Sequence, residues 1–142
     1  MRPREPQFDS LSLEDERRVY LEGIRHFNAG EFFEAHEVWE EAWNKVLDKR
    51  REQFYRAIIR GAVALELLCR GRAVGARQVF LDCMATFEGL PDDFLGIHIP
   101  TYVESLRTAL EPALIDLDAR AVQIRPDLLF RISLSDGWAI ES

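Results

Sequence analysis

One histidine and two glutamates in a single short segment are the residues of this chain best suited to chemistry. They are His36, Glu37 and Glu40. Side chains four positions apart meet on one face of a helix, so His36 and Glu40 can touch. An imidazole beside a carboxylate can act as a general base or supply a ligand to a divalent metal. These three residues are the catalytic candidates, and whether the protein is an enzyme is left open.

A metal centre would need a further ligand from another element. His26 precedes this segment on a separate predicted helix, so His26, His36 and Glu40 are the candidates for a mononuclear site. Di-iron bundles use a Glu-x-x-His pair one helical turn apart. Glu31 and Glu34 stand at the wrong distance before His36 for that motif, which argues against a di-iron centre.

The alternative role of these side chains is structural. A histidine at a helix interface can hydrogen-bond a carboxylate or a backbone carbonyl, and His36 can do so without any catalytic purpose. Glu37 can pair with Arg56 or Arg60 on the next helix. The sequence leaves the structural and the functional roles open.

Four helices are predicted before residue 90, because apolar residues recur there at helical spacing. Ser12 is a typical N-cap, and Gly30, Gly71 and Gly89 are typical residues after a helix end. On helix two, Trp39 and Trp43 lie on the apolar face and are expected in the core. The expected helices cover residues 13–28, 31–46, 52–70 and 73–87.

The chain changes character after residue 98. Pro100 suits the first turn of a fifth helix, and Pro112 should kink or divide that helix, which can resume over residues 113–120. The last segment alternates apolar and polar residues, which is typical of an extended chain. We expect it to cross the bundle as a tail, with Trp138 anchoring the tail or another subunit; its apolar positions are Leu128, Phe130, Ile132 and Leu134.

An internal repeat separates packing residues from the rest. Shifting the chain by 41 positions aligns Gly30 with Gly71 and Trp39 with Phe80, which predicts two similar helical hairpins. The pattern of residues 30–42, which includes Gly30, Ala35 and Trp39, also resembles the second helix of a tetratricopeptide repeat, in its packing alone. The repeat does not account for the catalytic candidates, which align with Arg77, Gln78 and Leu81.

Composition limits the class of protein. The chain has 142 residues and a formal charge of −7, which disfavours binding to nucleic acid. Four basic residues do cluster, but on an expected interhelical loop (Lys45, Lys49, Arg50 and Arg51). The most apolar stretch, residues 57–69, is interrupted by Arg60 and Glu66, so no membrane span is expected.

Further features place the chain among intracellular globular proteins. Its first residues lack the apolar core of a secretory signal, so we expect a cytoplasmic protein. Cys69 and Cys83 lack paired spacing and are expected as small core residues. The fold class is therefore all-α: one domain over residues 1–142, a compact bundle of five to six helices, with residues 1–10 and about 121–142 irregular or extended.

One run of sequence resembles a known family. The letters FNAGEFFEAHEVWEEAW, from Phe27 to Trp43, resemble the signature of the domain-of-unknown-function 309 family (DUF309). The resemblance continues through residues 59–65 and 70–72 and through Gly75 and Ala76. It implies an α-helical bundle with no established biochemical activity. The family pattern places a Gln and a His on the third helix, where this chain has Arg60 and Leu67.

Two functions from different classes remain after the sequence analysis. The first is a protein-interaction or structural module, with the acidic face of the second helix and the apolar tail as candidate surfaces. Its partner would be another protein or a second copy of the chain. The alternative is a metal-binding protein or a hydrolase-type enzyme that uses His36 with Glu37 and Glu40; its cofactor is unknown.

Overall fold

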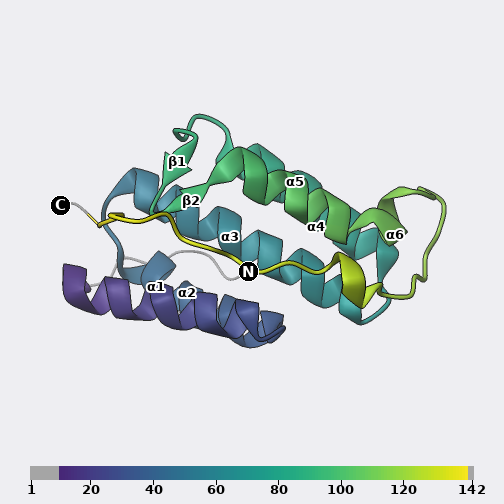
Figure 1. The fold of residues 1–142 in the computed structure, drawn as a ribbon, viewed down its shortest axis with the longest axis horizontal. Helices are drawn as coiled ribbons and strands as arrows, with labels where there is room; N and C mark the ends of the chain where they lie inside the picture. Colours follow the sequence, from purple (N-terminus) through teal and green to yellow (C-terminus); the bar gives the residue numbers. More distant parts are fainter. Residues whose placement is uncertain (1–9, 141–142) are drawn as a thin grey trace.

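The computed structural model describes residues 10–140 as an α-helical bundle (Figure 1). Expectations for residues 1–9 and 141–142 lie outside the described part. Among these residues, a short hairpin of two strands and one isolated bridge depart from the all-α class. The elements are α1 Leu13–Asn28, α2 Phe32–Lys45, α3 Lys49–Cys69, α4 Ala73–Phe87, β1 Asp93–Phe94, β2 Ile97–His98, α5 Ile99–Ala109, α6 Glu111–Leu114 and the 3₁₀ turn Pro126–Leu128. The predicted fold class is confirmed.

Helix α3 begins three residues earlier than the sequence predicted. Asp48 is its N-cap, and the Asp48 carboxylate accepts a hydrogen bond of 2.9 Å from the backbone N–H of Arg51. The expectation that Lys45 and residues 49–51 form a solvated loop is therefore wrong. Lys45 ends α2, and residues 49–51 form the first turn of α3. The Arg51 side chain reaches the buried Glu16 carboxylate at 2.9 Å.

The two hairpins repeat each other at the level of backbone hydrogen bonds. Gly30 and Gly71 both have positive φ, at 77° and 75°. After each glycine a backbone N–H returns to a carbonyl five residues earlier: Glu31 to His26, and Arg72 to Leu67, both at 2.9 Å. This bond is the outer one of a Schellman motif. The repeat inferred from the sequence thus corresponds to two helix ends with the same geometry.

The core lies where the repeat places its large aromatic residues. Trp39 is fully buried and Phe80 is 1% exposed. The Trp39 indole lies against Gly23 of α1 and donates a hydrogen bond of 3.1 Å to the Tyr20 carbonyl. Trp43 is also buried, so both tryptophans of α2 occupy the core as predicted.

The two cysteines differ. Cys83 is buried, and its thiol donates to the Ala57 carbonyl across the α3–α4 contact. Cys69 is exposed at the end of α3, so its expected place in the core is wrong. The expectation rested on the lack of paired cysteine spacing, which carries no information on burial, and Cys69 is the last residue of α3.

The chain after α5 is less helical than predicted. Pro112 lies at the start of α6, which is short and ends at Leu114 and not near residue 120. Arg77 of α4 accounts for this early end. Its guanidinium donates to the carbonyls of Ala113 and Ala119 at 2.9 and 2.8 Å, which holds the chain in a turn.

The last described residues run as an extended tail along the bundle, between α1 and α5 (Figure 1). Apart from the 3₁₀ turn and one isolated bridge, the tail has no regular structure, so the expected extended path is confirmed. None of the helices formed by residues 10–140 is both long and apolar enough to cross a membrane.

Candidate functional site

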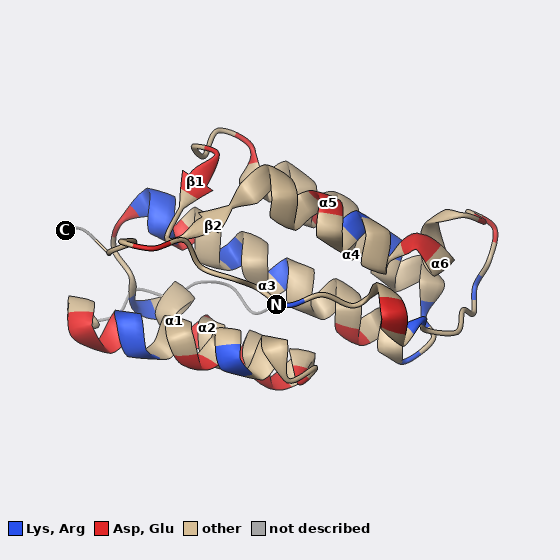
Figure 2. Cartoon of the chain, viewed as in Figure 1, with Lys and Arg blue, Asp and Glu red and all other residues tan. Residues whose placement is uncertain are grey.

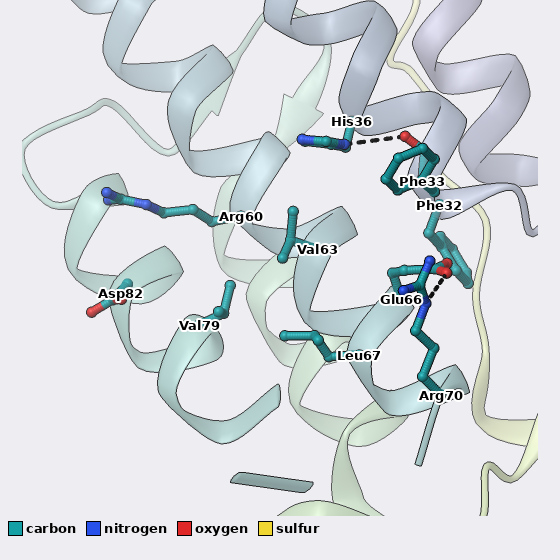
Figure 3. A pocket seen from close by; sticks show the side chains of 10 residues that line it. All are labelled: Phe32, Phe33, His36, Arg60, Val63, Glu66, Leu67, Arg70, Val79 and Asp82. Carbon is teal, nitrogen blue, oxygen red and sulfur yellow. Dashed lines mark hydrogen bonds and ion pairs between the residues drawn. The ribbon is translucent and has the colours of Figure 1, made fainter. Parts of the chain in front are cut away.

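A pocket of about 500 Å³ opens between α2, α3 and α4, and His36 lies in its wall (Figure 3). Volumes of this size are typical of sites for small ligands. Its apolar lining comes from α2 (Phe32 and Phe33), α3 (Val63 and Leu67) and α4 (Val79). Its polar lining is His36, Arg60, Glu66, Arg70 and Asp82.

His36 has an acceptor at each ring nitrogen. Nε2 lies 3.2 Å from the Glu40 carboxylate, which is the contact that the spacing predicts. Nδ1 lies 3.2 Å from the Phe33 carbonyl of the same helix. A neutral imidazole carries one N–H and satisfies only one of these acceptors at a time. Both side chains are largely buried, at 18% and 17% exposure.

Glu37 stays outside this arrangement. Its side chain is exposed and does not line the pocket. Arg56 instead lies 3.8 Å from Glu52, and Arg60 donates a hydrogen bond to the Thr86 hydroxyl. The structure therefore pairs both arginines elsewhere than the sequence suggested.

Both ring nitrogens of His26 contact carboxylates of its own hairpin. Its Nδ1 lies 3.0 Å from Glu31 and its Nε2 lies 4.0 Å from Glu22. Within residues 10–140 no group of three or more His, Cys, Asp or Glu side chains could hold a metal ion. The structure thus brings Glu40 to His36, but it does not assemble His26, His36 and Glu40 around one point.

The remaining charged residues of the pocket were not among the candidates predicted from the sequence. Glu66 and Arg70 form an i,i+4 ion pair at 2.9 Å, which their spacing could have indicated. Arg60 interrupts the apolar stretch of α3, and the sequence suggested it as a partner of Glu37 and not as part of a pocket. A charged residue inside such a stretch is itself a signal of a polar cavity.

Charged residues of both signs are distributed over the bundle. Figure 2 shows Lys and Arg on α1, α3 and α5, interspersed with Asp and Glu.

Arg70 also lies over the Phe33 ring, with its guanidinium carbon 6.0 Å from the ring centre. The Phe33 ring in turn lies 5.5 Å from the His36 ring, so the three side chains form one edge of the pocket.

A second candidate site is the groove that the tail occupies between α1 and α5. The side-chain amide of Asn28 hydrogen-bonds the tail backbone through both its nitrogen and its oxygen. Its Nδ2 donates to the Ile132 carbonyl at 3.0 Å, and the Ile132 N–H donates to its Oδ1 at 2.6 Å. This pair satisfies both backbone groups of one residue, as a neighbouring strand would.

Aromatic side chains line the same groove. Phe130 of the tail packs edge-on against Phe27 of α1 and Tyr102 of α5, with ring centres 5.4 and 5.7 Å apart. Burial raises the pKa of the Tyr102 hydroxyl well above its usual value. Phe130 is therefore partly buried between two aromatic rings, one from α1 and one from α5.

Trp138 anchors the far end of the tail. Its ring packs edge-on against Tyr20 at 5.4 Å, and the Arg17 guanidinium lies 4.3 Å above the ring centre. Such a cation–π contact adds to the apolar burial. Of the two roles that the sequence offered for Trp138, anchoring of the chain's own tail is the one that the structure contains.

The comparisons with known proteins agree with the resemblance in the signature segment. Residues 20–79 match the model of DUF309, described as a domain of unknown function. An uncharacterized protein of Aquifex aeolicus (strain VF5) is 29% identical over 89 residues, which cover 63% of this chain and 27% of that protein. The chain thus spans about a quarter of this relative's length. The part of the chain that is similar to the DUF309 family is therefore residues 20–79, which include all of α2 and α3.

Proposed function

We propose that this protein is an interaction module that holds an extended segment of a partner protein in the groove between α1 and α5. The observation that carries this proposal is the double hydrogen bond between the Asn28 amide and the backbone of Ile132. Binding through the backbone accepts many sequences, while side-chain sites select among them. The chain's own tail is the occupant of the groove in the free protein.

The tail defines the pattern that a partner segment needs. Phe130 fills the site between Phe27 and Tyr102, Ile132 is only 7% exposed, and Trp138 covers Tyr20. Exposed residues alternate with buried or partly buried ones over residues 130–134, so the ligand is an extended segment with apolar residues at alternate positions there and an aromatic residue farther on. The Aquifex relative supports a modular role, since the matched region is a minor part of its length.

The test uses the full chain and a labelled peptide of residues 126–140. In one variant, Phe130→Ala and Trp138→Ala weaken the chain's own tail and leave the groove intact. We expect the peptide to bind this variant at least about tenfold more tightly than the wild type, because a tethered tail competes at a high effective concentration. Fluorescence anisotropy measures both affinities.

Two further variants make this test specific. Adding Asn28→Ala to the weakened-tail variant should remove peptide binding, since the backbone clamp is lost. Arg131→Ala with Ser133→Ala changes only exposed positions of the tail, so it should leave the wild-type affinity unchanged. A peptide affinity that Asn28→Ala leaves unchanged contradicts the proposal. So does the absence of peptide binding to the weakened-tail variant.

A second candidate function rests on the contact between His36 and Glu40 in the pocket wall. It is a metal-binding protein or a hydrolase-type enzyme in which His36 acts with Glu40 and the exposed Glu37. Elemental analysis of the purified protein tests the metal, with His36→Ala as the matched variant. Metal bound at one equivalent by the wild type and lost in His36→Ala would favour this function over the interaction module.

A further inference from the structure

Arg60 is the pocket cation with the fewest partners. It lies half-buried in the middle of α3, and its guanidinium donates a hydrogen bond to the Thr86 hydroxyl. That hydroxyl donates in turn to the Asp82 carbonyl at 2.6 Å, so Thr86 fixes the position of Arg60. No carboxylate in residues 10–140 forms an ion pair with Arg60. Most of its five N–H donors are therefore available to a ligand.

The other charged groups of the pocket are paired or at its rim. Arg70 is held by Glu66, and His36 by Glu40. Asp82 is exposed on α4, and its carboxylate lies outside ion-pair distance of Arg60. Figure 3 shows Arg60 and Asp82 at one end of the pocket and the Glu66–Arg70 pair at the other. Within residues 10–140 Arg60 is thus a pocket cation that no carboxylate pairs, and the exposed Asp82 carboxylate lies at the same end of the pocket.

The space between these two ends is apolar. Val63 and Leu67 of α3 lie between Arg60 and Arg70, and Val79 of α4 faces them (Figure 3). Phe33 closes the α2 side and is 43% exposed, which is a large exposure for a Phe. A ligand that lies along this surface covers apolar side chains while one of its ends meets a guanidinium.

We propose that this pocket binds a carboxylate carried on an apolar body, with the carboxylate against Arg60 and the apolar part over Val63, Leu67 and Val79. A guanidinium matches a carboxylate through two parallel hydrogen bonds, which a neutral group cannot reproduce. A free aliphatic acid and the C-terminal residue of a peptide both carry this chemistry. The pocket shares no lining residue with the tail groove, so this proposal stands apart from the proposed function.

The first experiment varies the ligand and keeps the wild-type protein. Calorimetric titration of the full chain with octanoate and with octanamide compares a carboxylate with a neutral amide of the same length. We expect octanoate to bind at least about tenfold more tightly, since charge-assisted bonds are about twice as strong as neutral ones. Equal affinities for octanoate and octanamide overturn the proposal. So does the absence of binding of both octanoate and a peptide with a free C-terminus.

The second experiment varies the source of the carboxylate. A hexapeptide ending in Leu with a free C-terminus is compared with the same peptide amidated at its C-terminus. Tighter binding of the free-carboxylate peptide than of octanoate assigns the pocket to chain ends of proteins, and the reverse order assigns it to free acids. Either ranking of the free-carboxylate peptide and octanoate supports binding of a carboxylate on an apolar body. The proposal is contradicted if amidation leaves the peptide affinity unchanged and octanoate binds no more tightly than octanamide.

Variants locate the site. Arg60→Gln should lower the octanoate affinity at least about tenfold, and Arg60→Lys should also weaken it because Lys lacks the planar fork. Arg70→Gln is the matched control from the same helix, and it should change the affinity less than about threefold because Glu66 already pairs Arg70. An octanoate affinity unchanged by Arg60→Gln contradicts the site. If Arg60→Gln fails to fold, the wild-type comparison of octanoate with octanamide still decides.

Discussion

His36 and Arg60 line the same pocket but differ in what surrounds them. Both nitrogens of His36 face acceptors from its own helix, whereas Arg60 meets one hydroxyl from α4. The contact of His36 with Glu40 follows from helical spacing, so the sequence predicted it. The position of Arg60 depends on Thr86, 26 residues away, because α3 and α4 cross there. No local pattern contains that information.

The two thiols should differ in reactivity. Burial raises the pKa of the Cys83 thiol to about 12, and burial followed by the nearby Glu66 also raises the pKa of Cys69. At pH 8 a disulfide reagent such as dithionitrobenzoate should titrate the exposed Cys69 slowly and leave Cys83 unmodified. In denaturant both thiols should react. Rapid modification of two thiols in the folded protein would contradict the burial of Cys83.

The raised pKa of the Cys83 thiol should make the free energy of unfolding depend on pH. Its pKa is raised from 9.0 in the unfolded reference to about 12 in the fold, so its contribution is complete below pH 9. The contribution is lost as pH rises from 9 towards 12, because the unfolded state releases the proton first. Between pH 8 and pH 11 this thiol alone should lower the free energy of unfolding by on the order of 2 kcal/mol. Urea unfolding measures the change, and Cys83→Ser should make it smaller.

The two hairpins provide a matched pair of glycines for measuring the cost of one contact. Both Gly30 and Gly71 have positive φ, but a Cβ on Gly30 would meet open space, while a Cβ on Gly71 would lie 3.1 Å from the Val122 carbonyl. Gly30→Ala should destabilise the protein by about 1 kcal/mol, the cost of a left-handed alanine. Gly71→Ala should cost more, because it also displaces the chain at Val122.

Thermal or urea unfolding of both variants measures this difference. Gly75→Ala serves as a helical control, since its Cβ would meet only the flexible Leu67 side chain at 3.2 Å. Equal losses for Gly30→Ala and Gly71→Ala would mean that the contact with Val122 contributes nothing.

Helices were predictable where their ends carry local signals. The bounds of α1 and α4 agree with the sequence, because Ser12 caps the first and glycines stand near the ends of both. The start of α3 was misplaced because the run of charged residues after Asp48 has no apolar period. The end of the last helix depends on Arg77, whose carbonyl partners lie more than 30 residues away.

The tail makes the fold depend on contacts between α1 and residues more than 100 positions later. Trp138→Ala removes the ring that lies between Tyr20 and Arg17. Amides of the tail should then exchange hydrogen faster, above all Ser135, whose N–H donates to the Gly96 carbonyl at 2.9 Å. The amides of α2 and α3 should keep their protection, because these helices pack without the tail. Hydrogen exchange with mass spectrometry measures each segment.

A matched control for the tail is Leu117→Ala. Leu117 is 68% exposed in the turn after α6, so its truncation should leave exchange in the tail unchanged. Faster exchange throughout α2 and α3 in Trp138→Ala would show that the tail is part of the cooperative core. The sequence indicated an extended tail, but only the fold specifies that it lies between α1 and α5.

The clamp between Asn28 and Ile132 joins residues 104 positions apart, and this has a consequence for a chain made from its N-terminus. At about 5–20 residues per second, the ribosome needs roughly 5–20 s to add Ile132 after Asn28. Helix α1 therefore emerges with Asn28 and Phe27 uncovered, well before the tail exists. During each round of translation the α1 side of the groove is open to other chains until the tail has been made and can compete for it.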